Sequence, residues 1–325
     1  MLYYPYSEYL KNKYGEKVYK LPVNLPVTCP NRVNGDGCAF CAGAGAGFEA
    51  MEASVPVKEQ LTCTRERIAG KYKAKKFIAY FQNYTNTYLP LEEFSRVLME
   101  AATTPQVVEI SVSTRPDCIS REYLDVMQEV RAQTAVQMNV ELGLQTANYH
   151  TLDQIQRGHG IAEFIDAVLK IRCCVGFSIC AHVILNLPGD TMRDVVETAR
   201  VLSALQVDMV KLHSLYIAKN TRLCDWYENG KISICSKEEY IERAISFLEE
   251  IPDTIAVERL FSRIPEEDAV FCNWGTSWWK LKDELLKKME YENRRQGGKY
   301  HDLAGAALRE ADFIHAERSN EPKNL

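Results

Sequence analysis

Residues 28–47 read TCPNRVNGDGCAFCAGAGAG and place three cysteines in one turn-rich stretch. Eight residues separate Cys29 from Cys38, and two separate Cys38 from Cys41. Glycine recurs along this stretch, and because it has no side chain it lets the backbone pass close to a bound group. The spacing favours a shared metal centre over three buried core thiols.

Zinc and an iron–sulfur cluster are the two candidate metal centres. A structural zinc site normally has four closing ligands, and neither a second close cysteine pair nor a nearby histidine supplies the fourth. A [4Fe–4S] cluster with three protein ligands keeps one iron open for a substrate or cofactor. The chain has eleven cysteines, an odd number without even spacing, so a disulfide framework is not expected. Zinc therefore ranks second.

Outward from this stretch, apolar runs alternate with helical patterns along the chain. The runs read as strands covered on both faces, as in a parallel sheet, and cover 75–82, 107–113, 136–144, 177–187 and 207–217. A first strand at 18–27 is weaker because prolines interrupt it. Helices are predicted at 91–103, 120–134, 161–174 and 191–205, with Ser120 and Asp190 as N-caps. Six strand–helix units predict a doubly wound sheet or a complete or partial β/α barrel.

Polar residues cluster where each apolar run stops, at 82–87, 113–117, 144–146, 186–190 and 218–221. The carboxyl ends of parallel strands meet at one edge of a sheet, where ligand sites gather. We expect all of these segments, together with the cysteine stretch, to face one pocket.

The alternation breaks after about residue 253. A further strand is possible at 254–261, and 277–296 is predicted to be a helix with many lysines and arginines. We expect a barrel unit at 1–252, with the cysteine loop at 28–48, and a C-terminal extension at 253–325 whose last ten residues or so are disordered.

Composition excludes some classes of protein. Charged residues make up 26% of the 325-residue chain and no apolar run is long enough to cross a bilayer, so a membrane protein is not expected. The N-terminus lacks the order of a secretory signal, which predicts a cytoplasmic location. A net charge of −5 argues against broad, nonspecific nucleic-acid binding but permits a local basic face.

The motifs resemble a known family. CAFC (38–41), which follows a strand that opens a β/α series, resembles the radical S-adenosylmethionine (SAM) superfamily. The first gap of eight residues is unusual there and is similar to a subset that includes YhcC-like proteins and the radical SAM core of the Elongator catalytic subunit. Further segments resemble YhcC-like motifs in the same order: AYFQNYTNTY (79–88), STRPDC (113–118), ELGLQT (141–146), CAHVILNLPGDT (180–191) and KLHSLYIAKNTRL (211–223).

The resemblance implies a fold and a chemistry. The fold would be a partial (β/α)6 barrel of the TIM type, an α/β class, with a C-terminal strand and helix extension. A [4Fe–4S] cluster would bind SAM at its open iron and cleave it reductively, and the radical formed would abstract hydrogen from the substrate. Flavodoxin or ferredoxin would supply the electron.

The resemblance also implies residue roles. Cys29, Cys38 and Cys41 would ligate the cluster, and Phe40 would flank the adenine. Other positions would contact SAM: Gln82, Asn83 and Thr85 near its amino group, Ser113 and Arg115 after the third strand, Glu141 on a hydroxyl, Gln145 on the ribose and Arg157 on the carboxylate. His182, Lys211 and Lys219 are the catalytic candidates, and the two lysines with His213 would hold an anionic substrate.

Similarity to the Elongator core points to tRNA as the substrate. The leading hypothesis is hydrogen abstraction from the C5 side chain of a wobble uridine, for example conversion of carboxymethylaminomethyl to aminomethyl. The basic helix at 277–296 and its tryptophans could contact the RNA. Two alternatives remain open: a radical SAM enzyme that acts on a small metabolite or peptide, and a non-enzymatic iron–sulfur or zinc module.

Overall fold

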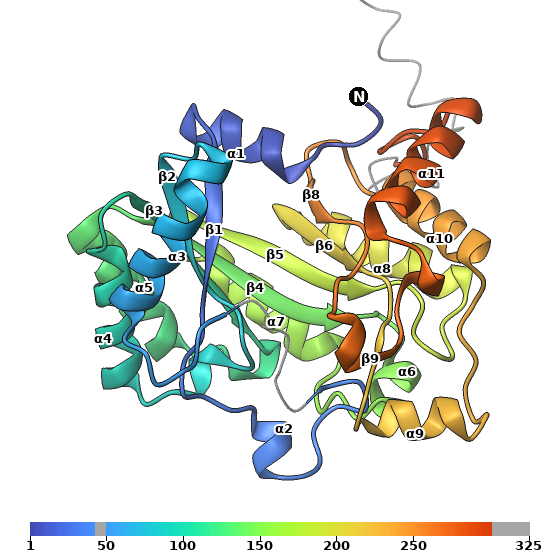
Figure 1. Cartoon of the computed structure of the whole chain (residues 1–325), viewed down its shortest axis with the longest axis horizontal. Helices are drawn as coiled ribbons and strands as arrows, with labels where there is room; N and C mark the ends of the chain where they lie inside the picture. Colours follow the sequence, from blue (N-terminus) through green and yellow to red (C-terminus); the bar gives the residue numbers. More distant parts are fainter. Residues whose placement is uncertain (43–49, 301–325) are drawn as a thin grey trace, which may run out of the picture.

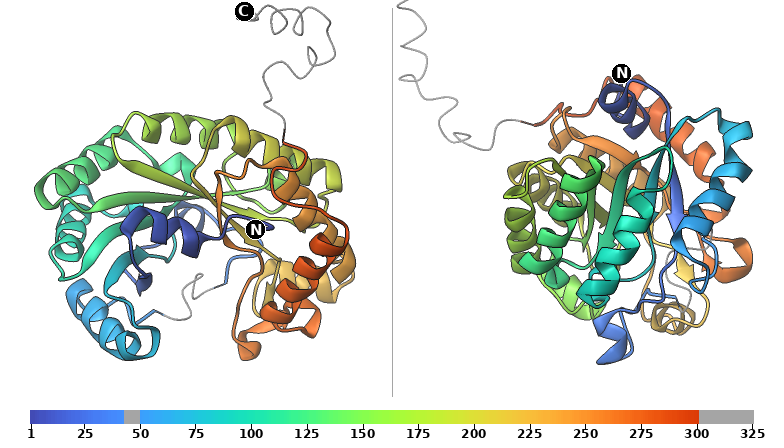
Figure 2. Two further views of the ribbon diagram at one scale, coloured as in Figure 1. Left: turned by 90° about the horizontal axis from the view of Figure 1, so that it is seen from above. Right: turned by 90° about the vertical axis from the view of Figure 1, so that its left-hand side faces the viewer.

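A single curled sheet organises the chain. The computed structural model describes residues 1–42 and 50–300, and within these ranges seven parallel strands pair in the order β1-β2-β3-β4-β5-β6-β8. The sheet forms an open arc, with helices along its convex side (Figures 1 and 2). The strands are β1 (Val18–Val23), β2 (Lys76–Phe81), β3 (Val107–Thr114), β4 (Gln137–Gln145), β5 (Phe177–Ile184), β6 (Met209–His213) and β8 (Ala256–Arg259).

Helices follow the strands in the expected alternation. The helices of the described part are α1 (Tyr6–Tyr14), α2 (Pro30–Val33), α3 (Val57–Tyr72), α4 (Leu91–Ala102), α5 (Arg121–Thr134), α6 (Tyr149–Gln154), α7 (Ile161–Arg172), α8 (Met192–Ala204), α9 (Arg222–Glu228), α10 (Lys237–Glu250) and α11 (Trp278–Tyr291). The predicted partial barrel, with parallel strands and an outer layer of helices, is confirmed.

Two details differ from the sequence-based expectation. The apolar run 207–217 is not one strand: β6 ends at His213, and β7 (Ile217–Ala218) pairs antiparallel with β9 (Ala269–Phe271) in a separate two-stranded sheet. The break has a physical cause, because the backbone N–H of Leu215 donates to the Asn186 side chain at 2.7 Å instead of to a neighbouring strand. In addition, the N-cap of α8 is Thr191, which forms a capping box with Asp194, and not Asp190.

The strand predicted within 254–261 is β8, and it extends the main sheet beyond β6. The sheet therefore continues past residue 252, where we expected the barrel unit to end, and the domain division stays a prediction. Part of the cysteine loop (43–48) and the tail predicted to be disordered lie outside the described residues.

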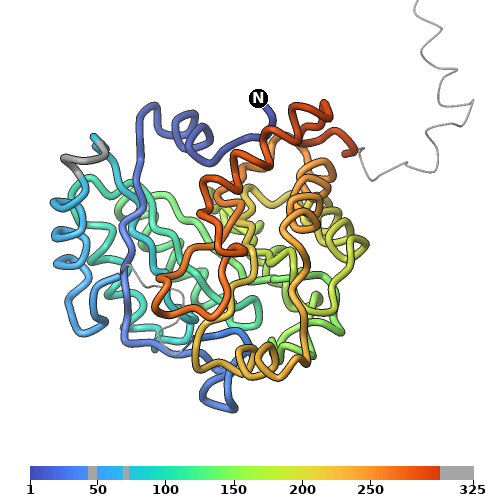
Figure 3. Tube along the Cα trace, turned by 45° about the vertical axis from the view of Figure 1, so that its right-hand side comes forward, coloured from blue at the N-terminus to red at the C-terminus, as the bar shows by residue number. Residues whose placement is uncertain are grey.

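The N-terminal segment closes one end of the arc. The arc leaves β1 and β8 as edge strands, and an exposed edge is open to unwanted pairing. The backbone N–H of Val257 in β8 donates to the Tyr4 carbonyl at 2.8 Å, and Gln296 beyond α11 donates to the Leu2 carbonyl at 2.9 Å. Figure 3 shows the N-terminal segment and α11 at the same end of the molecule. None of the helices in the described ranges is long and apolar enough to span a bilayer.

Candidate functional site

The cysteine stretch leaves the carboxyl end of β1 and is fixed by its neighbours. Ala39, between the second and third cysteines, is fully buried in an apolar cluster with Leu187, Leu215 and Leu223. Its N–H donates to the Ile155 carbonyl and its own carbonyl accepts from Leu223, both at 2.9 Å. The stretch is therefore anchored by a buried alanine, which leaves the flanking cysteines to face inward.

The three thiols line one cavity inside the arc. It has a volume of about 180 Å³, and Cys29 and Cys38 are buried while Cys41 is partly exposed. Gly37, at φ +78°, makes the turn before Cys38, and a Cβ there would approach the Arg32 side chain to 3.1 Å. Burial raises the pKa of Cys41, and the neighbouring Cys38 raises it further, against the opposing effect of Arg32.

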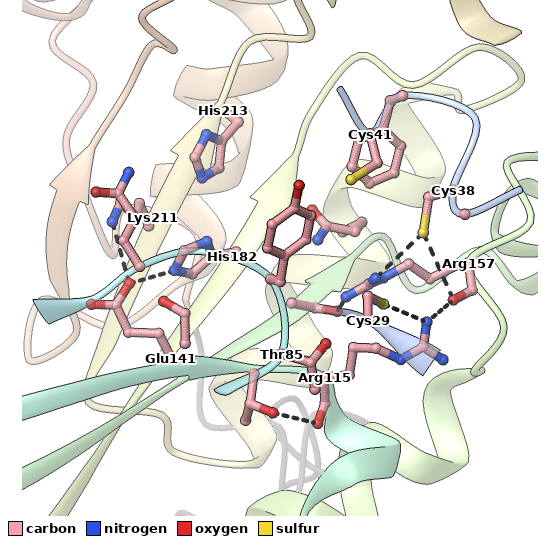
Figure 4. A pocket seen from close by; sticks show the side chains of 18 of the residues that line it. Cys29, Cys38, Cys41, Thr85, Arg115, Glu141, Arg157, His182, Lys211 and His213 are labelled. Atoms are coloured by element: carbon pink, nitrogen blue, oxygen red, sulfur yellow. Dashed lines mark hydrogen bonds and ion pairs between the residues drawn. The ribbon is translucent and has the colours of Figure 1, made fainter. Parts of the chain in front are cut away.

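Each sulfur lies beside a different arginine. Figure 4 shows Arg115 beside Cys29 and Arg157 beside Cys38. Arg115 Nη1 is 3.8 Å from Cys29 Sγ, Arg157 Nη1 is 3.5 Å from Cys38 Sγ, and Arg32 Nη2 is 3.8 Å from Cys41 Sγ. Guanidinium groups stay protonated, so they stabilise negative charge on the sulfurs.

These arginines are themselves held in place. Arg115 Nη1 donates to the Arg157 carbonyl at 2.9 Å, and its remaining nitrogens pair with Asp117 at 2.9 and 2.6 Å. Arg157 Nη2 donates to the Gly143 carbonyl at 3.0 Å. A Cβ at Gly143 would come within 2.5 Å of that nitrogen, so any other residue there would displace the guanidinium from this position. The arginine positions are therefore set by β4 and by the segment after β3.

A buried charge network forms the opposite wall. Glu141, whose side chain is 0% exposed, accepts from Lys20 and Ser111 at one oxygen, both at 2.6 Å. Its other oxygen accepts from His182 at 2.6 Å and from Lys211 at 3.2 Å. Glu258 completes the network, with Lys20 at 2.7 Å and Lys211 at 2.8 Å. Two carboxylates thus balance two ammonium groups.

The network explains several shifted pKa values. Burial alone would raise the pKa of Glu141, but the ammonium groups of Lys20 and Lys211 and the hydrogen bond from His182 hold it well below its usual range. Burial lowers the pKa of His182, against the effect of Glu141, so we assign a neutral imidazole. Cys180 lies near Glu141 and His182, yet the lysines already neutralise the carboxylate. This cluster is therefore a poor second metal site.

Four polar atoms of residues that line the cavity are buried without a hydrogen-bond partner among the described residues: Arg32 Nε, Thr85 Oγ1, Arg157 Nε and His213 Nε2. Buried polar atoms are normally satisfied, so each such atom calls for an explanation. Polar groups of a bound molecule inside the cavity would satisfy them.

Most of the predicted site residues meet here. Besides the cysteines, the cavity is lined by Phe40, Gln82, Thr85, Ser113, Arg115, Glu141, Gln145, Arg157, His182, Lys211 and His213. Two predicted residues do not line it. Asn83 donates from Nδ2 to Asn24 at 2.7 Å, and Lys219 is exposed and donates to the Glu267 carbonyl at 2.7 Å. The structure therefore does not bring Lys219 to this cavity.

Other predictions need adjustment. Glu141 has protein partners at both oxygens, so it needs no SAM hydroxyl to satisfy it. The strand ends 186–190 and 218–221 do not line the cavity, because Leu187, Leu215 and Ile217 pack into the apolar cluster around Ala39. The fifth and sixth strands reach the cavity instead through His182 and Lys211.

Several lining residues were missed from sequence: Arg32, Tyr80, Tyr84, Tyr216, Arg259 and Arg263. Arg32 stands within the cysteine stretch and could have been found there. Tyr80 lies between buried apolar residues of β2, so from the sequence it is expected in the hydrophobic core. Arg259 and Arg263 come at the end of β8 and just after it, where only the position relative to the last strand could have indicated them.

Comparison with known proteins settles the family. Residues 23–202 match the model of the Radical SAM superfamily, and residues 207–291 match the Radical_SAM C-terminal domain. The chain belongs to the Radical SAM superfamily. Enzymes of this superfamily use a [4Fe–4S] cluster and S-adenosylmethionine, and the chain is accordingly a radical SAM enzyme with these cofactors.

Two sequence relatives and one solved structure show which proteins the chain is similar to. Protein YhcC of Escherichia coli K12 is 30% identical over 92% of this chain and 93% of its own length. A tRNA uridine(34) acetyltransferase of Methanocaldococcus infernus is 25% identical over 58% of this chain and 34% of its own length. The structure of archaeal Elp3 from M. infernus superposes with a TM-score of 0.65 at 18% identity, over 86% of this chain and 64% of that one. The chain therefore spans less than two thirds of Elp3, and the superposition shows a shared fold.

The cavity fits these cofactors. Three convergent thiols on one loop are a suitable donor set for an iron–sulfur cluster, and the adjacent arginines offset its negative charge. The unpartnered Thr85, Arg157 and His213 atoms lie in the same cavity, next to the cysteines and the charge network.

Proposed function

We propose that Cys29, Cys38 and Cys41 hold the cluster and that S-adenosylmethionine lies between them and the charge network of Glu141. The observation that carries this assignment is the pairing of each thiol with its own arginine beside unpartnered buried polar atoms. Together the bound cofactors supply a carbon-centred radical that abstracts hydrogen from the substrate. The remaining work of the chain is to bind, orient and exclude water.

Arg157 is the residue we assign to the SAM carboxylate. Its Nη atoms are engaged by Cys38 and Gly143, while its Nε is buried and unpartnered and lines the cavity. A carboxylate can accept from that nitrogen in a charge-assisted hydrogen bond. Gln145 and Thr85 are assigned to the ribose side and the amino side respectively, as lining residues of strand ends.

Glu141, His182 and Lys211 are better understood as a positioning network than as direct reactants. Each is satisfied within the protein, and Lys211 also donates to the Tyr80 hydroxyl at 3.0 Å. The network forms the wall of the cavity opposite the cysteines. Its ionised groups are held in defined positions by one another, so they do not need water as a hydrogen-bond partner.

The substrate we propose is a tRNA, modified at the C5 side chain of its wobble uridine, for example from carboxymethylaminomethyl to aminomethyl. The sequence similarity to a tRNA uridine(34) acetyltransferase, which spans 58% of this chain, supports this proposal. A reduced flavodoxin or ferredoxin would deliver the electron.

Nucleoside analysis tests the substrate. Total tRNA from a strain that lacks the gene should contain more of the C5-carboxymethylated uridine and less of its aminomethyl product than tRNA from the parent strain. Expression of the wild-type chain should restore the parental profile, and expression of the Cys38→Ser variant should not. A parental profile in the deletion strain would remove the tRNA assignment and leave the superfamily chemistry untouched.

A further inference from the structure

A second cavity opens beside the first. It has a volume of about 740 Å³ and lies at the open side of the arc, between β1 and β8. Its walls come from the N-terminal segment, β1, β8 and α11. Five residues line both this cavity and the cysteine cavity, namely Tyr80, Gln82, Lys211, Arg259 and Arg263. The two cavities therefore adjoin, and the second forms a passage from the surface toward the cysteines.

The second cavity is basic. Six cationic side chains line it, namely Lys17, Lys20, Lys211, Arg259, Arg263 and Lys282, and of these Lys20 and Lys211 are balanced by Glu141 and Glu258. The single acidic residue among its lining residues is Glu258, which is already paired with Lys20 at 2.7 Å and Lys211 at 2.8 Å. The chain as a whole carries a net charge of −5, so this is a local concentration of positive charge in an acidic protein. Such a cavity attracts anions.

Three of the cations meet in a smaller recess beside the passage. The recess, of about 180 Å³, is lined by Arg259, Arg263 and Lys282 together with Tyr3 and Trp278. Glu258 also lines it, and its carboxylate is paired with Lys20 and Lys211. Arg259 and Lys282 form no ion pair with any residue in the described ranges. The Arg263 guanidinium lies 3.8 Å from the centre of the Trp278 ring, and Lys282 Nζ lies 5.8 Å from that of Tyr3. The aromatic ring of Tyr3 positions Lys282 without neutralising its charge.

The lining also offers aromatic surface. Tyr3, Tyr6, Tyr19 and Tyr80 line the passage. Aromatic side chains stack on nucleobases with little sequence preference, whereas cations bind the intervening phosphates. The volume falls within the range of about 300–1,000 Å³ that is typical of ligand sites, which is sufficient for one or two nucleotides.

We propose that Arg259, Arg263 and Lys282 form a phosphate subsite that holds the backbone of single-stranded RNA, so that the target nucleotide enters the passage toward the cysteine cavity. This inference rests on the proposed function, and it adds where the RNA backbone binds and which side chains hold it. The subsite lies at the junction of the two cavities, because Arg259 and Arg263 line both. A phosphate held there is adjacent to the space assigned to the reaction.

Equilibrium binding tests the subsite. The full-length chain is titrated into a fluorescein-labelled single-stranded RNA of ten nucleotides, and fluorescence anisotropy is followed at several KCl concentrations. Arg259→Gln and Lys282→Gln should each weaken binding several-fold. Each should also lower the slope of log affinity against log salt concentration by about 0.7, the value for one lost phosphate contact on a single strand.

Matched variants control for folding and for general charge. Lys287→Gln removes the same charge from the same helix, at an exposed position that lines none of the cavities described above, and should leave affinity and slope unchanged. Arg259→Lys keeps the charge and should retain the wild-type slope. Circular dichroism at the assay temperature checks that every variant is folded.

The outcomes separate this inference from the proposed function. If wild-type protein binds RNA and the Gln variants at 259, 282 and 287 all bind as tightly as it does, the phosphate subsite is wrong and the tRNA assignment stands. If Lys287→Gln weakens RNA binding as much as the variants at 259 and 282 do, the RNA binds on the outer face of α11, and the phosphate subsite is also wrong. If unlabelled adenosine monophosphate displaces the labelled RNA as effectively as unlabelled RNA does, the subsite binds a small phosphorylated metabolite. That result would contradict the proposal that it holds an RNA backbone. Absence of RNA binding by the wild type would overturn the subsite, and the nucleoside profile of the deletion strain would still decide the tRNA assignment.

Discussion

At the residue scale, the pairing of thiols with arginines has an electrochemical consequence. The charge and hydrogen bonds around an iron–sulfur cluster set its reduction potential, and Arg32 Nη2 lies 3.8 Å from Cys41 Sγ. Replacement of Arg32 by glutamine removes one positive charge from the immediate surroundings. We predict that the midpoint potential of the anaerobically reconstituted cluster becomes roughly 50–100 mV more negative. A redox titration followed by electron paramagnetic resonance measures this change.

Arg32→Lys is the control, because it keeps the charge while removing Nη2, which donates to the Cys41 and Ala42 carbonyls at 3.0 and 2.7 Å. Its potential should stay close to that of the wild type. A wild-type potential in Arg32→Gln would show that this arginine only supports the loop.

The Glu141 network makes a prediction about stability. Glu141→Gln leaves Lys20 and Lys211 with one carboxylate between them in a buried position, and removal of one partner of a buried ion pair costs about 3–5 kcal/mol. Ser111→Ala removes only one neutral donor to the same carboxylate and should cost about 1 kcal/mol. Urea unfolding of the cluster-free protein measures both. Equal losses for the two variants would contradict the ionic account.

At this scale, the sequence predicted residues whose role depends on local spacing. The cysteine triplet was identifiable from its own stretch, and Arg157 and Glu141 through the resemblance to known motifs. Lys20 and Glu258 could not be paired from sequence, because 238 positions separate them and only closure of the arc brings them together. Asn83 and Lys219 were misplaced because the direction of a side chain just after a strand depends on how the backbone turns there.

At the element scale, the segment between β5 and α8 carries a carboxyl group with an unusual pKa. Burial raises the pKa of Asp190 to about 6, with Asp194 acting in the same direction, against hydrogen bonds from Thr151 and Thr146 and the charge of Arg243. Because the folded state holds this proton more tightly than the unfolded state, stability falls as the pH rises from about 4 to about 6. Below about pH 4 the carboxyl is protonated in both the folded and the unfolded state, so it does not change the free energy of unfolding with pH. Above about pH 6 it is ionised in both states, and the loss of stability has reached its full value.

Asp190→Asn should remove this penalty while keeping an acceptor for the Thr151 hydroxyl, which donates to Asp190 at 2.6 Å. We predict that the difference in free energy of unfolding between the variant and the wild type is about 2 kcal/mol more favourable to the variant at pH 7.5 than at pH 4.5. Urea unfolding at the two pH values measures the difference. Asp166→Asn, at an exposed position on α7, should change stability little and equally at both. A gain at Asp190 that does not depend on pH would contradict the assignment.

Elements with strong hydrophobic patterns were predictable, and those defined by tertiary contacts were not. The apolar runs of β2 to β5 matched within three residues at each end because burial on both faces leaves a continuous signal. The run at 207–217 misled, because its last residues are buried against the Ala39 cluster rather than in the main sheet. Continuous burial does not distinguish these two environments.

At the scale of the whole molecule, the N-terminal segment packs along β8 at the open side of the arc, at the same end of the molecule as α11. Besides its contacts with β8, the N-terminal segment provides Lys13 and Tyr14, which donate to the buried Glu109 of β3 at 2.8 and 2.5 Å. Deletion of residues 1–14 should expose this carboxylate and the β8 edge. We predict faster hydrogen exchange at β1, β3 and β8, with α7 and α8 unchanged. Unaltered exchange at β8 would show that the segment does not protect the edge.

The global architecture followed from sequence, because alternating strands and helices leave few arrangements. The arrangement of the open side did not, since it depends on tertiary contacts of the N-terminal segment and α11, and the helical pattern predicted at 277–296 does not indicate where that helix packs. The basic passage is formed where those segments meet, so it could be recognised only after the arc was known.

The central claim is that Cys29, Cys38 and Cys41 hold an iron–sulfur cluster with one open iron. Anaerobic reconstitution of the wild type, followed by iron analysis and Mössbauer spectroscopy, tests it most directly, with the Cys29→Ser/Cys38→Ser/Cys41→Ser variant and the Cys118→Ser control in parallel. The account predicts about four iron atoms per chain in a [4Fe–4S] cluster for the wild type and for Cys118→Ser, and none for the triple variant. A cluster retained by the triple variant, or lost with Cys118 alone, would contradict it.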